Sequence, residues 1–397
     1  METDGIGRAA FLLGAGVSLA AGMPSTSELT AKVLEGAVSR GMDSHYRLGL
    51  AQPWNAENGS LDHVGLVMVV VHELKTEVDA FYSGYPARIA NYEDIYYLAV
   101  QIADAMSGEF DNPALRLLVE RLAPILAPLF TSVQRGATVE EMLLEAGNET
   151  VRCIEDVVWQ SLAGAPTKST MMPAAVGAAA DEELDGLDVF TLNHDTVLEE
   201  SLKSAGIPFA DGFAEQQGSV CPWNMALLQN GPARTRVVKL HGSIDWCYYG
   251  GLGLAKTVDR SMYHFTLPDE TISQEWGLGH PVILCGTFNK MLEYLRGPFL
   301  DLHLLFREAL DSVNLLVVSG YSFGDKGINN RLWEWMADDR GRRLVVVHEN
   351  HDALVREARG MVKKNWESWK EAGKLICVPK WFEAVTWAEI KERIAAS

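Results

Sequence analysis

Polar side chains that could do chemistry stand directly after two apolar segments of the sequence. Asn193 and Asp195 follow the run Val189–Leu192. His241 follows the run Val237–Leu240. An imidazole titrates near neutral pH and can act as a general base, whereas an amide can orient water or a hydroxyl without taking its proton. Residues just past the carboxyl ends of parallel strands converge on one crevice, so we predict that Asn193 and His241 meet in a single catalytic site.

Two glycine-bearing turns follow other apolar segments and complete the candidate site. The predicted ligand contacts are Gly14, Ala15, Gly16 and Ser18 in the first turn and Gly320, Tyr321 and Ser322 in the second. Glycine lets the backbone approach a pyrophosphate, and the start of a following helix favours its negative charge. The full dinucleotide fingerprint needs a glycine where Leu19 stands, and an ordinary tight turn explains either segment alone. Together with the polar strand ends, the turns predict a nucleotide site.

Three further polar residues have a structural alternative to ligand binding. Asp195 could accept a hydrogen bond from a ligand amide, but an acidic residue at such a place is also a common helix cap. Glu349 and Asn350 follow a later apolar segment. An acidic residue at the end of a strand holds a ribose hydroxyl in nucleotide-binding folds, although an ordinary loop would have the same composition. Both alternatives stay open for all three residues.

The charge of the chain restricts its partners. Among 397 residues, 53 are acidic and 34 are basic, which gives a net charge of −19. Contacts to phosphates need clustered Lys and Arg, so this acidity argues against a broad nucleic-acid surface and against an anionic membrane, although a local basic strip is compatible with it. No apolar stretch reaches the roughly 18 residues of a membrane span, and the N-terminal segment lacks the positive charge of a secretory signal. We expect a cytoplasmic protein without direct nucleic-acid binding.

The cysteines do not form a metal-binding pattern. There are five of them, and no two have the CxxC spacing of a zinc site: Cys153, Cys221, Cys247, Cys285 and Cys377. Scattered thiols in an odd number fit a reducing cytoplasm. We therefore expect a site that works without a metal.

Short runs rich in Val, Ile and Leu predict strands that are buried on both faces. These runs are 10–14, 187–192, 236–240, 281–285, 313–319, 343–348 and the less distinct 375–379. The helical segments expected around them are 25–40, 196–205, 291–312 and 328–337. Strands that alternate with helices indicate a parallel sheet with crossover helices. The fold class is therefore α/β, with a Rossmann-like parallel sheet of about six strands and flanking helices.

The region from 45 to 180 has a different pattern. It contains helical periodicity and few strand signals, with expected helices at 61–80, 92–106, 114–135 and 139–162. An all-helical insertion after the first strand and helix accounts for this most simply. We predict a Rossmann-like domain of residues 1–44 and 181–397 and an inserted helical domain of residues 45–180.

Taken in order, these motifs resemble the sirtuin-like superfamily, and most of all its bacterial NAD-consuming branch of anti-phage defence systems. The matching segments are Gly14–Ser18 with Ala21–Ser25, Asn91–Asp94, Thr191–Asp195, Lys239–Ser243 and Gly320–Asp325. Protein-deacylating sirtuins carry a four-cysteine zinc module, which this sequence lacks. They also carry an Asp-Phe-Arg run where this chain has Ser25-Thr26-Ser27. Both differences favour NAD hydrolysis over deacylation.

The resemblance implies NAD as the substrate, no metal, and cleavage to nicotinamide and ADP-ribose. Asn193 and His241 match the catalytic pair of the family. The first glycine turn would hold phosphate or the nicotinamide ribose, and the second would contact the remaining nucleotide. Members are usually gated by a trigger, by homo-oligomerisation or by a partner such as a HerA-like ATPase. A regulatory module that binds NAD without turnover, and a zinc-free protein deacylase, stay open as alternatives. Preference between NAD and NADP, and a linear or cyclic product, also stay open.

Overall fold

The long strands of the chain gather in one of two units. The computed structural model describes residues 7–41, 44–49, 61–84, 88–130, 136–165, 172–249, 253–258, 280–287, 290–338 and 340–397. The first unit is built from Met1–Met23, Ala165–Ile283 and Met291–Ser397, and the second from Pro24–Gly164 and Leu284–Lys290. The domain limits predicted from the sequence remain a prediction.

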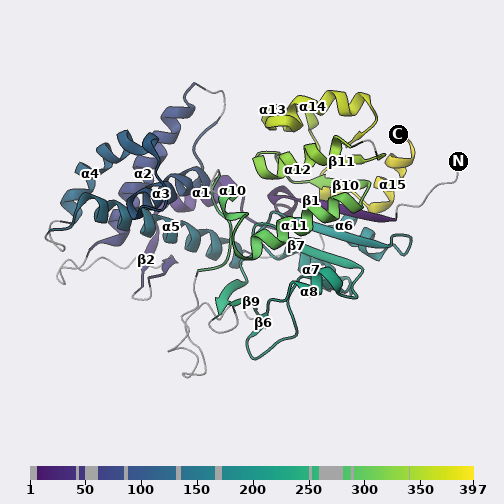
Figure 1. Cartoon of the computed structure of the whole chain (residues 1–397), viewed down its shortest axis with the longest axis horizontal. Helices are drawn as coiled ribbons and strands as arrows, with labels where there is room; N and C mark the ends of the chain where they lie inside the picture. Colours follow the sequence, from purple (N-terminus) through teal and green to yellow (C-terminus); the bar gives the residue numbers. More distant parts are fainter. Residues whose placement is uncertain are drawn as a thin grey trace. The chain divides into compact units, whose positions relative to one another are not determined.

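A parallel sheet of seven strands forms the centre of the first unit, in the order β12-β11-β10-β1-β4-β7-β5. Figure 1 labels β1, β7, β10 and β11 of this sheet. The strands are β1 (Arg8–Leu13), β4 (Gly186–Thr191), β5 (Phe209–Ala210), β7 (Thr235–Lys239), β10 (Leu315–Ser319), β11 (Arg343–Val347) and β12 (Leu375–Val378). All neighbouring strands pair in parallel. The side chains of β4 and β10 are buried throughout. Burial on both faces explains why these strands are continuous apolar runs in the sequence. The predicted α/β class and parallel sheet are confirmed.

Helices cover both faces of this sheet. The helices of the first unit include α6 (Pro173–Ala180), α7 (Val197–Ser204), α11 (Gly297–Ser312), α12 (Lys326–Met336), α13 (His351–Glu357), α14 (Gly360–Glu371) and α15 (Trp387–Ala395). The ring of Phe190 lies 4.7 Å from that of Phe306 in α11, and the ring of Phe11 lies 5.9 Å from that of Trp387 in α15. Phe11 pairs with Val189, so Phe11 and Phe190 point to opposite faces because side chains alternate along strands. The helices α11 and α15 therefore pack on opposite faces.

The first unit also contains a small antiparallel sheet. Its strands, in spatial order, are β6 (Val220–Pro222), β9 (Gly253–Thr257) and β8 (Trp246–Tyr249), and all three lie between β5 and β10 in the sequence. The strand predicted at 281–285 is wrong, because its described residues make only an isolated bridge between Ile283 and Gly242. The Val282 amide donates to the carbonyl of Trp246, the first residue of β8, and the Val282 carbonyl accepts from Ser243 in the turn before it, so this segment bonds to a turn and a strand end without forming a ladder. Its apolar composition reflects burial and not a strand.

The second unit is mainly helical. It contains α1 (Thr26–Glu35), α2 (His63–Tyr82), α3 (Tyr92–Ser107), α4 (Arg116–Phe130), α5 (Val139–Ala163) and the hairpin β2 (Val38–Arg40) with β3 (Tyr46–Leu48). The predicted helices are confirmed with small shifts at their ends, but the end predicted for α4, 131–135, lies outside the described residues. The first helix stops at Glu35 and not at Arg40, because Gly36 takes a left-handed φ of 64° and ends it.

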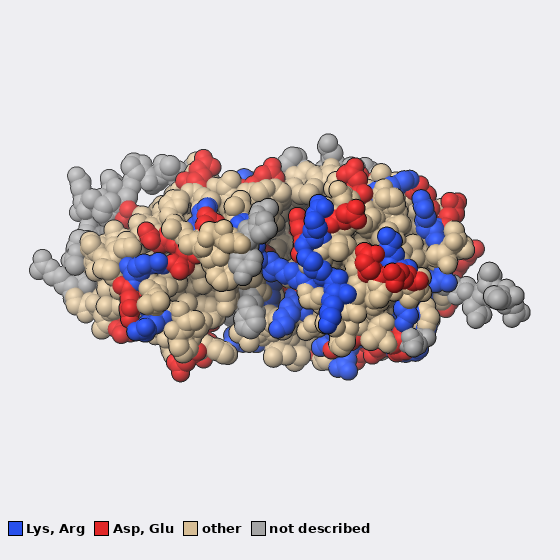
Figure 2. Space-filling view, turned by 90° about the horizontal axis from the view of Figure 1, so that it is seen from above, with Lys and Arg blue, Asp and Glu red and all other residues tan. Residues whose placement is uncertain are grey.

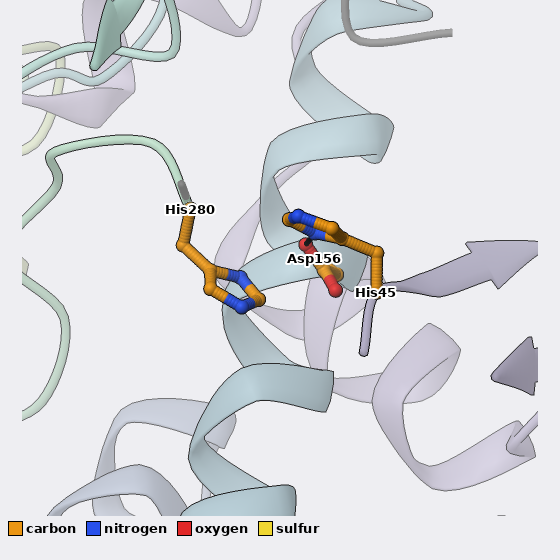
Figure 3. A group of neighbouring side chains, drawn as sticks. All are labelled: His45, Asp156 and His280. Atoms are coloured by element: carbon orange, nitrogen blue, oxygen red, sulfur yellow. Dashed lines mark hydrogen bonds and ion pairs between the residues drawn. The ribbon is translucent and has the colours of Figure 1, made fainter. Parts of the chain in front are cut away.

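Buried carboxylates on α5 attach the hairpin to the helices of the second unit. Glu149 accepts from Arg40 Nη2 at 2.9 Å and from the Tyr46 hydroxyl at 2.6 Å. About two turns further on, Asp156 Oδ1 lies 3.1 Å from His45 Nδ1 (Figure 3), and Oδ2 accepts from the Tyr46 amide at 2.7 Å. Neither carboxylate residue is exposed. The hairpin is therefore held by polar bonds that apolar periodicity could not predict.

We expect Glu149→Ala to lower the free energy of unfolding by about 3 kcal/mol, because the Arg40 guanidinium would lose its buried counterion. Glu145→Ala is the matched control. The side chain of Glu145 lies on the same helix but is 37% exposed, so we expect less than about 1 kcal/mol. Chemical denaturation of the two variants measures both values. Equal losses would show that the network does not stabilise the fold.

Another buried carboxylate links three strands of the large sheet. Asp188 on β4 is fully buried and accepts paired hydrogen bonds from Arg8 on β1 and Arg236 on β7. Burial would raise the pKa of Asp188, but the hydrogen bonds from Arg236 and Arg8 outweigh it and hold the pKa below its usual value. A carboxyl with a lowered pKa in the folded state stabilises the fold above its unfolded pKa of about 3.9.

We therefore expect the free energy of unfolding to fall as the pH drops below about 4, where the unfolded chain binds a proton that the native Asp188 resists. Urea unfolding measured between neutral pH and pH 3 checks this. Asp188→Asn should flatten the dependence, because the amide does not titrate. An unchanged slope in that variant would contradict the assignment to Asp188.

Two further features of the fold are the apolarity of its helices and the charges on its surface. Among the described residues, no helix combines the length and apolarity that a membrane crossing requires. Lys and Arg side chains gather in one part of the face seen in Figure 2, and Asp and Glu are spread around it. Basic side chains are therefore unevenly distributed over this face.

Candidate functional site

The two glycine turns meet at the carboxyl ends of β1 and β10. These strands are neighbours, and the amides of Gly14 and Gly16 donate to the carbonyls of Ser319 and Gly320 at 2.9 and 3.0 Å. The chain continues from β1 to β4 and β7 on one side and later adds β10, β11 and β12 on the other. The strand order thus reverses at β1 and β10, which is where open α/β sheets bind ligands.

Close contact between the turns explains their glycines. A Cβ atom on Gly14 would lie 2.5 Å from the Gly320 carbonyl oxygen, and one on Gly320 would lie 2.4 Å from the Val17 nitrogen. Gly320 also takes a φ of 65°, which residues other than glycine rarely adopt. The amides of Gly14 and Gly16 donate to protein carbonyls, and the predicted ligand contacts of these residues remain a prediction. Ala15 is exposed beside them.

Asn193 and His241 lie on adjacent strand ends. Thr191 of β4 pairs with Lys239 of β7, and each site residue stands two positions beyond its paired residue. The loops are joined directly, because the Leu240 amide donates to the Thr191 carbonyl at 2.9 Å. The structure therefore places the predicted amide and imidazole at one edge of the sheet.

The side chain of Asn193 is fixed on one side only. It is 7% exposed, and its Nδ2 donates to the Ser18 hydroxyl at 3.0 Å. Its Oδ1 atom is buried and accepts no hydrogen bond from any residue that the structure describes. An unpaired buried acceptor costs about 1–3 kcal/mol, so this oxygen is suited to a water or a ligand hydroxyl. Ser18, predicted to contact ligand, is the partner that orients Asn193.

His241 is joined to two residues that the sequence analysis did not select. It is 4% exposed, and its Nε2 lies 2.8 Å from the Tyr294 hydroxyl. Tyr294 donates to Asp325 Oδ2 at 2.5 Å, and Asp325 Oδ1 accepts from the Gly327 and Ile328 amides at the start of α12. Asp325 is the last residue of the second glycine motif, Gly320–Asp325, so the motif could have indicated it as a site residue. Tyr294 lies in the loop between α10 (Lys290–Glu293) and α11, and no local signal marks it.

Asp195 and Tyr321 support the local structure. Asp195 Oδ1 accepts from the Val197 amide at 3.0 Å, and its carbonyl accepts from Lys239 Nζ. The hydroxyl of Tyr321 lies 2.9 Å from Asn329 Oδ1, and burial raises the pKa of this phenol well above its usual value. Ser322 is exposed on the same turn. Asp195 stands one position before Thr196, the N-cap of α7, so its bond to Val197 supports the start of the helix without capping it, and ligand contacts of these three residues remain predictions.

Glu349 and Asn350 follow β11, one strand beyond the glycine turns. Both are exposed and line an open hollow of about 570 Å³ together with His351 and Asp352. Asn350 Oδ1 accepts from the Ala353 amide at 2.9 Å and caps α13. Glu349 therefore has the more available side chain of the two for a ribose hydroxyl.

A polar cavity of about 390 Å³ lies between α7 and the small sheet. Its lining includes Glu199, Lys239 and Asp245, but neither Asn193 nor His241. Lys239 Nζ pairs with Glu199 Oε1 at 3.0 Å, and burial raises the pKa of Glu199. The cavity is therefore distinct from the predicted site, although Lys239 is the last residue of β7, two positions before His241.

One group of potential metal ligands lies wholly within the second unit. Side chains of His63, Glu145 and Glu149 bring one ligand atom each within 4.8 Å of one another. Glu149 already accepts from Arg40, Tyr46 and Arg152. Two guanidinium groups neutralise this carboxylate, so the group fits a metal ion poorly.

Comparison with known proteins identifies one similar domain. Residues 188–372 match the model of the SIR2-like domain. This segment contains Asn193, Asp195, His241 and the predicted contacts from Gly320 to Asn350, but not the first glycine turn. A search of curated proteins finds no match.

Several solved structures are similar over most of their length. A Sir2 homolog in complex with NAD is 13% identical, with 99% of this chain and 91% of that chain covered and a TM-score of 0.39. Sir2 bound to an acetylated peptide is 13% identical, with coverage of 99% and 95% and a TM-score of 0.38. A mutant Sir2 homologue with 2′-O-acetyl ADP-ribose is 12% identical, with coverage of 98% and 92% and a TM-score of 0.38.

Proposed function

We propose that this chain binds NAD and hydrolyses the bond between nicotinamide and ribose. The match to the SIR2-like domain supports a site that uses NAD. The observation that carries the proposal is the buried Oδ1 of Asn193, which no described residue satisfies, on the strand end next to that of His241. Such a site offers an acceptor and a base to one ligand.

In the proposed reaction, the bond from C1′ of the ribose to nicotinamide breaks, and its electron pair leaves with neutral nicotinamide. The oxygen of a water forms the new bond to C1′, and the water loses one proton. Asn193 Oδ1 accepts from this water or from a ribose hydroxyl and orients it. His241 takes the proton and passes it to solvent. The products are ADP-ribose, nicotinamide and a proton.

The remaining predicted contacts have graded support. Gly320 and Ser322 stand at the strand-order reversal, and we propose that they border the phosphates and the adjoining ribose. Glu349, exposed one strand further along, is proposed to bind the adenosine ribose. Asp195 is proposed to reach the carboxamide of nicotinamide through its second carboxylate oxygen. The first turn contributes through Ser18, which positions Asn193.

We also propose that turnover is gated and serves anti-phage defence by NAD depletion in the cytoplasm, because unrestrained NAD hydrolysis would kill the cell that makes the enzyme. The resemblance of the motifs to defence proteins supports this role, with a homo-oligomer or a HerA-like ATPase as the activating partner. The absence of a CxxC pair supports a reaction that needs no zinc module.

Nicotinamide release from NAD by the purified chain tests the proposal, with the chain alone, at high concentration and with candidate partners. Calorimetric titration with NAD accompanies the assay. Binding with release of nicotinamide and ADP-ribose supports hydrolysis. Binding without turnover under every condition would favour a regulatory module, and acyl transfer from an acylated lysine peptide to ADP-ribose would favour a deacylase. No binding of NAD would refute the proposal.

A further inference from the structure

We propose that Asp325 and Tyr294 hold His241 as the tautomer with its proton on Nε2, so that Nδ1 is the basic nitrogen of the site. The three side chains form a continuous chain from carboxylate to phenol to imidazole. The Tyr294 hydroxyl lies 2.5 Å from Asp325 Oδ2 and 2.8 Å from His241 Nε2. The role of these three hydrogen-bonded side chains in turnover rests on the proposed function, but the assignment of the tautomer does not.

The number of protons in this chain determines the tautomer. A phenol has a single proton to donate, and a carboxylate can only accept. Tyr294 therefore gives its proton to Asp325, and its oxygen is left to accept at the other side. The donor at 2.8 Å must then be Nε2–H of His241. Neutral imidazole has one proton, so the lone pair lies on Nδ1.

Packing holds each member of the chain in place. Asp325 Oδ1 is fixed by the amides of Gly327 and Ile328 at 2.8 and 3.1 Å. The ring of Tyr294 stacks on His303 with centroids 3.7 Å apart, and a Cβ on Gly327 would lie 2.7 Å from Tyr294 Cε2. Burial lowers the pKa of His303 to about 4, so this ring is neutral at physiological pH. Tyr294 is thus confined between the uncharged ring of His303 and the backbone of Gly327.

The same chain stabilises the proton that His241 would gain. Asp325 Oδ2 lies 3.6 Å from His241 Nε2, within the range of an ion pair once the imidazole is charged. A hydrogen bond that ends on a carboxylate becomes stronger when its donor is charged. In the proposed reaction Nδ1 takes the proton from water or a ribose hydroxyl, and the cation is stabilised through Tyr294. Tyr294 and Asp325 are therefore positioning residues.

Asp325→Asn gives a direct test because it should reverse the tautomer. Asn caps a helix as well as Asp does, so its carbonyl oxygen can still accept from the Gly327 amide. Its amide nitrogen then faces Tyr294 and donates to the phenol oxygen. The phenol proton turns toward Nε2, which must become the acceptor, and the imidazole proton moves to Nδ1.

Long-range nitrogen–proton spectra of protein labelled with ¹⁵N-histidine read the tautomer without any turnover. The signals of His241 are those that His241→Gln removes from the ten histidines. Asp301→Asn, an exposed change on α11, is the matched control, and unchanged signals of the other histidines report an intact fold. We expect Nε2–H in the wild type and in Asp301→Asn, and Nδ1–H in Asp325→Asn. A wild-type Nδ1–H form, or no change in Asp325→Asn, would overturn the proposal.

Nicotinamide release then separates this inference from the proposed function. We expect Asp325→Asn to lower kcat at least about 100-fold at unchanged KM, and Tyr294→Phe to lower it less, because the phenylalanine leaves Nε2 unpaired and does not reverse the tautomer. If the spectra show the expected tautomers but neither the wild type nor any variant releases nicotinamide, the NAD proposal alone is refuted. Turnover that depends on His241, with the opposite tautomer in the spectra, would refute the present inference alone.

Discussion

His241→Ala is expected to lower the rate of nicotinamide release by about 10²- to 10⁴-fold, the usual contribution of a general base. The residue is 4% exposed at the end of β7, and its imidazole is connected through Tyr294 to a carboxylate. Removal of the ring takes away the proton acceptor and leaves the phenol without its donor. We therefore expect the loss to appear in kcat and not in the binding of NAD.

The matched control for this change is His72→Ala, which removes an exposed imidazole on α2. It should keep wild-type turnover. A thermal melt of both variants shows whether the fold survives. A folded His241→Ala protein with wild-type kcat would exclude His241 as the base.

Asn193→Ala is the second change with a large expected effect, a loss of at least about 10²-fold in kcat. Asn193 Oδ1 is the buried acceptor that no described residue satisfies, and we propose that it orients the attacking water or a ribose hydroxyl. A misplaced reactant costs rate because the correct geometry supplies much of the barrier reduction. The change also releases Ser18, whose hydroxyl loses its contact with Nδ2.

Ser18→Ala separates these two effects. It keeps Oδ1 but removes the partner of Nδ2, so we expect an intermediate loss of kcat. Asn314→Ala, an exposed change ahead of β10, should have no effect. Kinetics at saturating NAD distinguish the three variants. If Ser18→Ala and Asn193→Ala lowered kcat by the same factor, the hydrogen bond between Ser18 and Asn193 would account for the whole effect of Asn193, and a separate role of Oδ1 would be excluded.

The strands that carry the site could be predicted because they are buried on both faces. Buried parallel strands produce unbroken apolar runs such as Val237–Leu240, and the residue that ends each run lies at the edge of the sheet. The short strands β5 and β6 have two and three residues, too few for a pattern. The segment 281–285 shows the converse error, because it is apolar and buried but makes only an isolated bridge.

The contacts within the site could be predicted only in part. The strand ends indicated Asn193 and His241, since topology brings adjacent strand ends together. Ser18 was indicated by the first glycine turn as a ligand contact and not as the partner of Asn193, and Tyr294 has no local signal, because both contacts depend on how a turn and a loop fold in space. The glycines of both turns were attributed to ligand binding, whereas their close backbone contacts give a structural reason for Gly14 and Gly320.

The central claim is that Asn193 and His241 act on one bound NAD, and a double-mutant cycle of nicotinamide release tests it most directly. Rates of the wild type, Asn193→Ala, His241→Ala and the double variant are measured under one activating condition. Residues that act as a unit lose rate non-additively, so we predict a double variant within a few-fold of the slower single variant. Full turnover in either single variant, or losses that multiply in the double variant, would contradict the account.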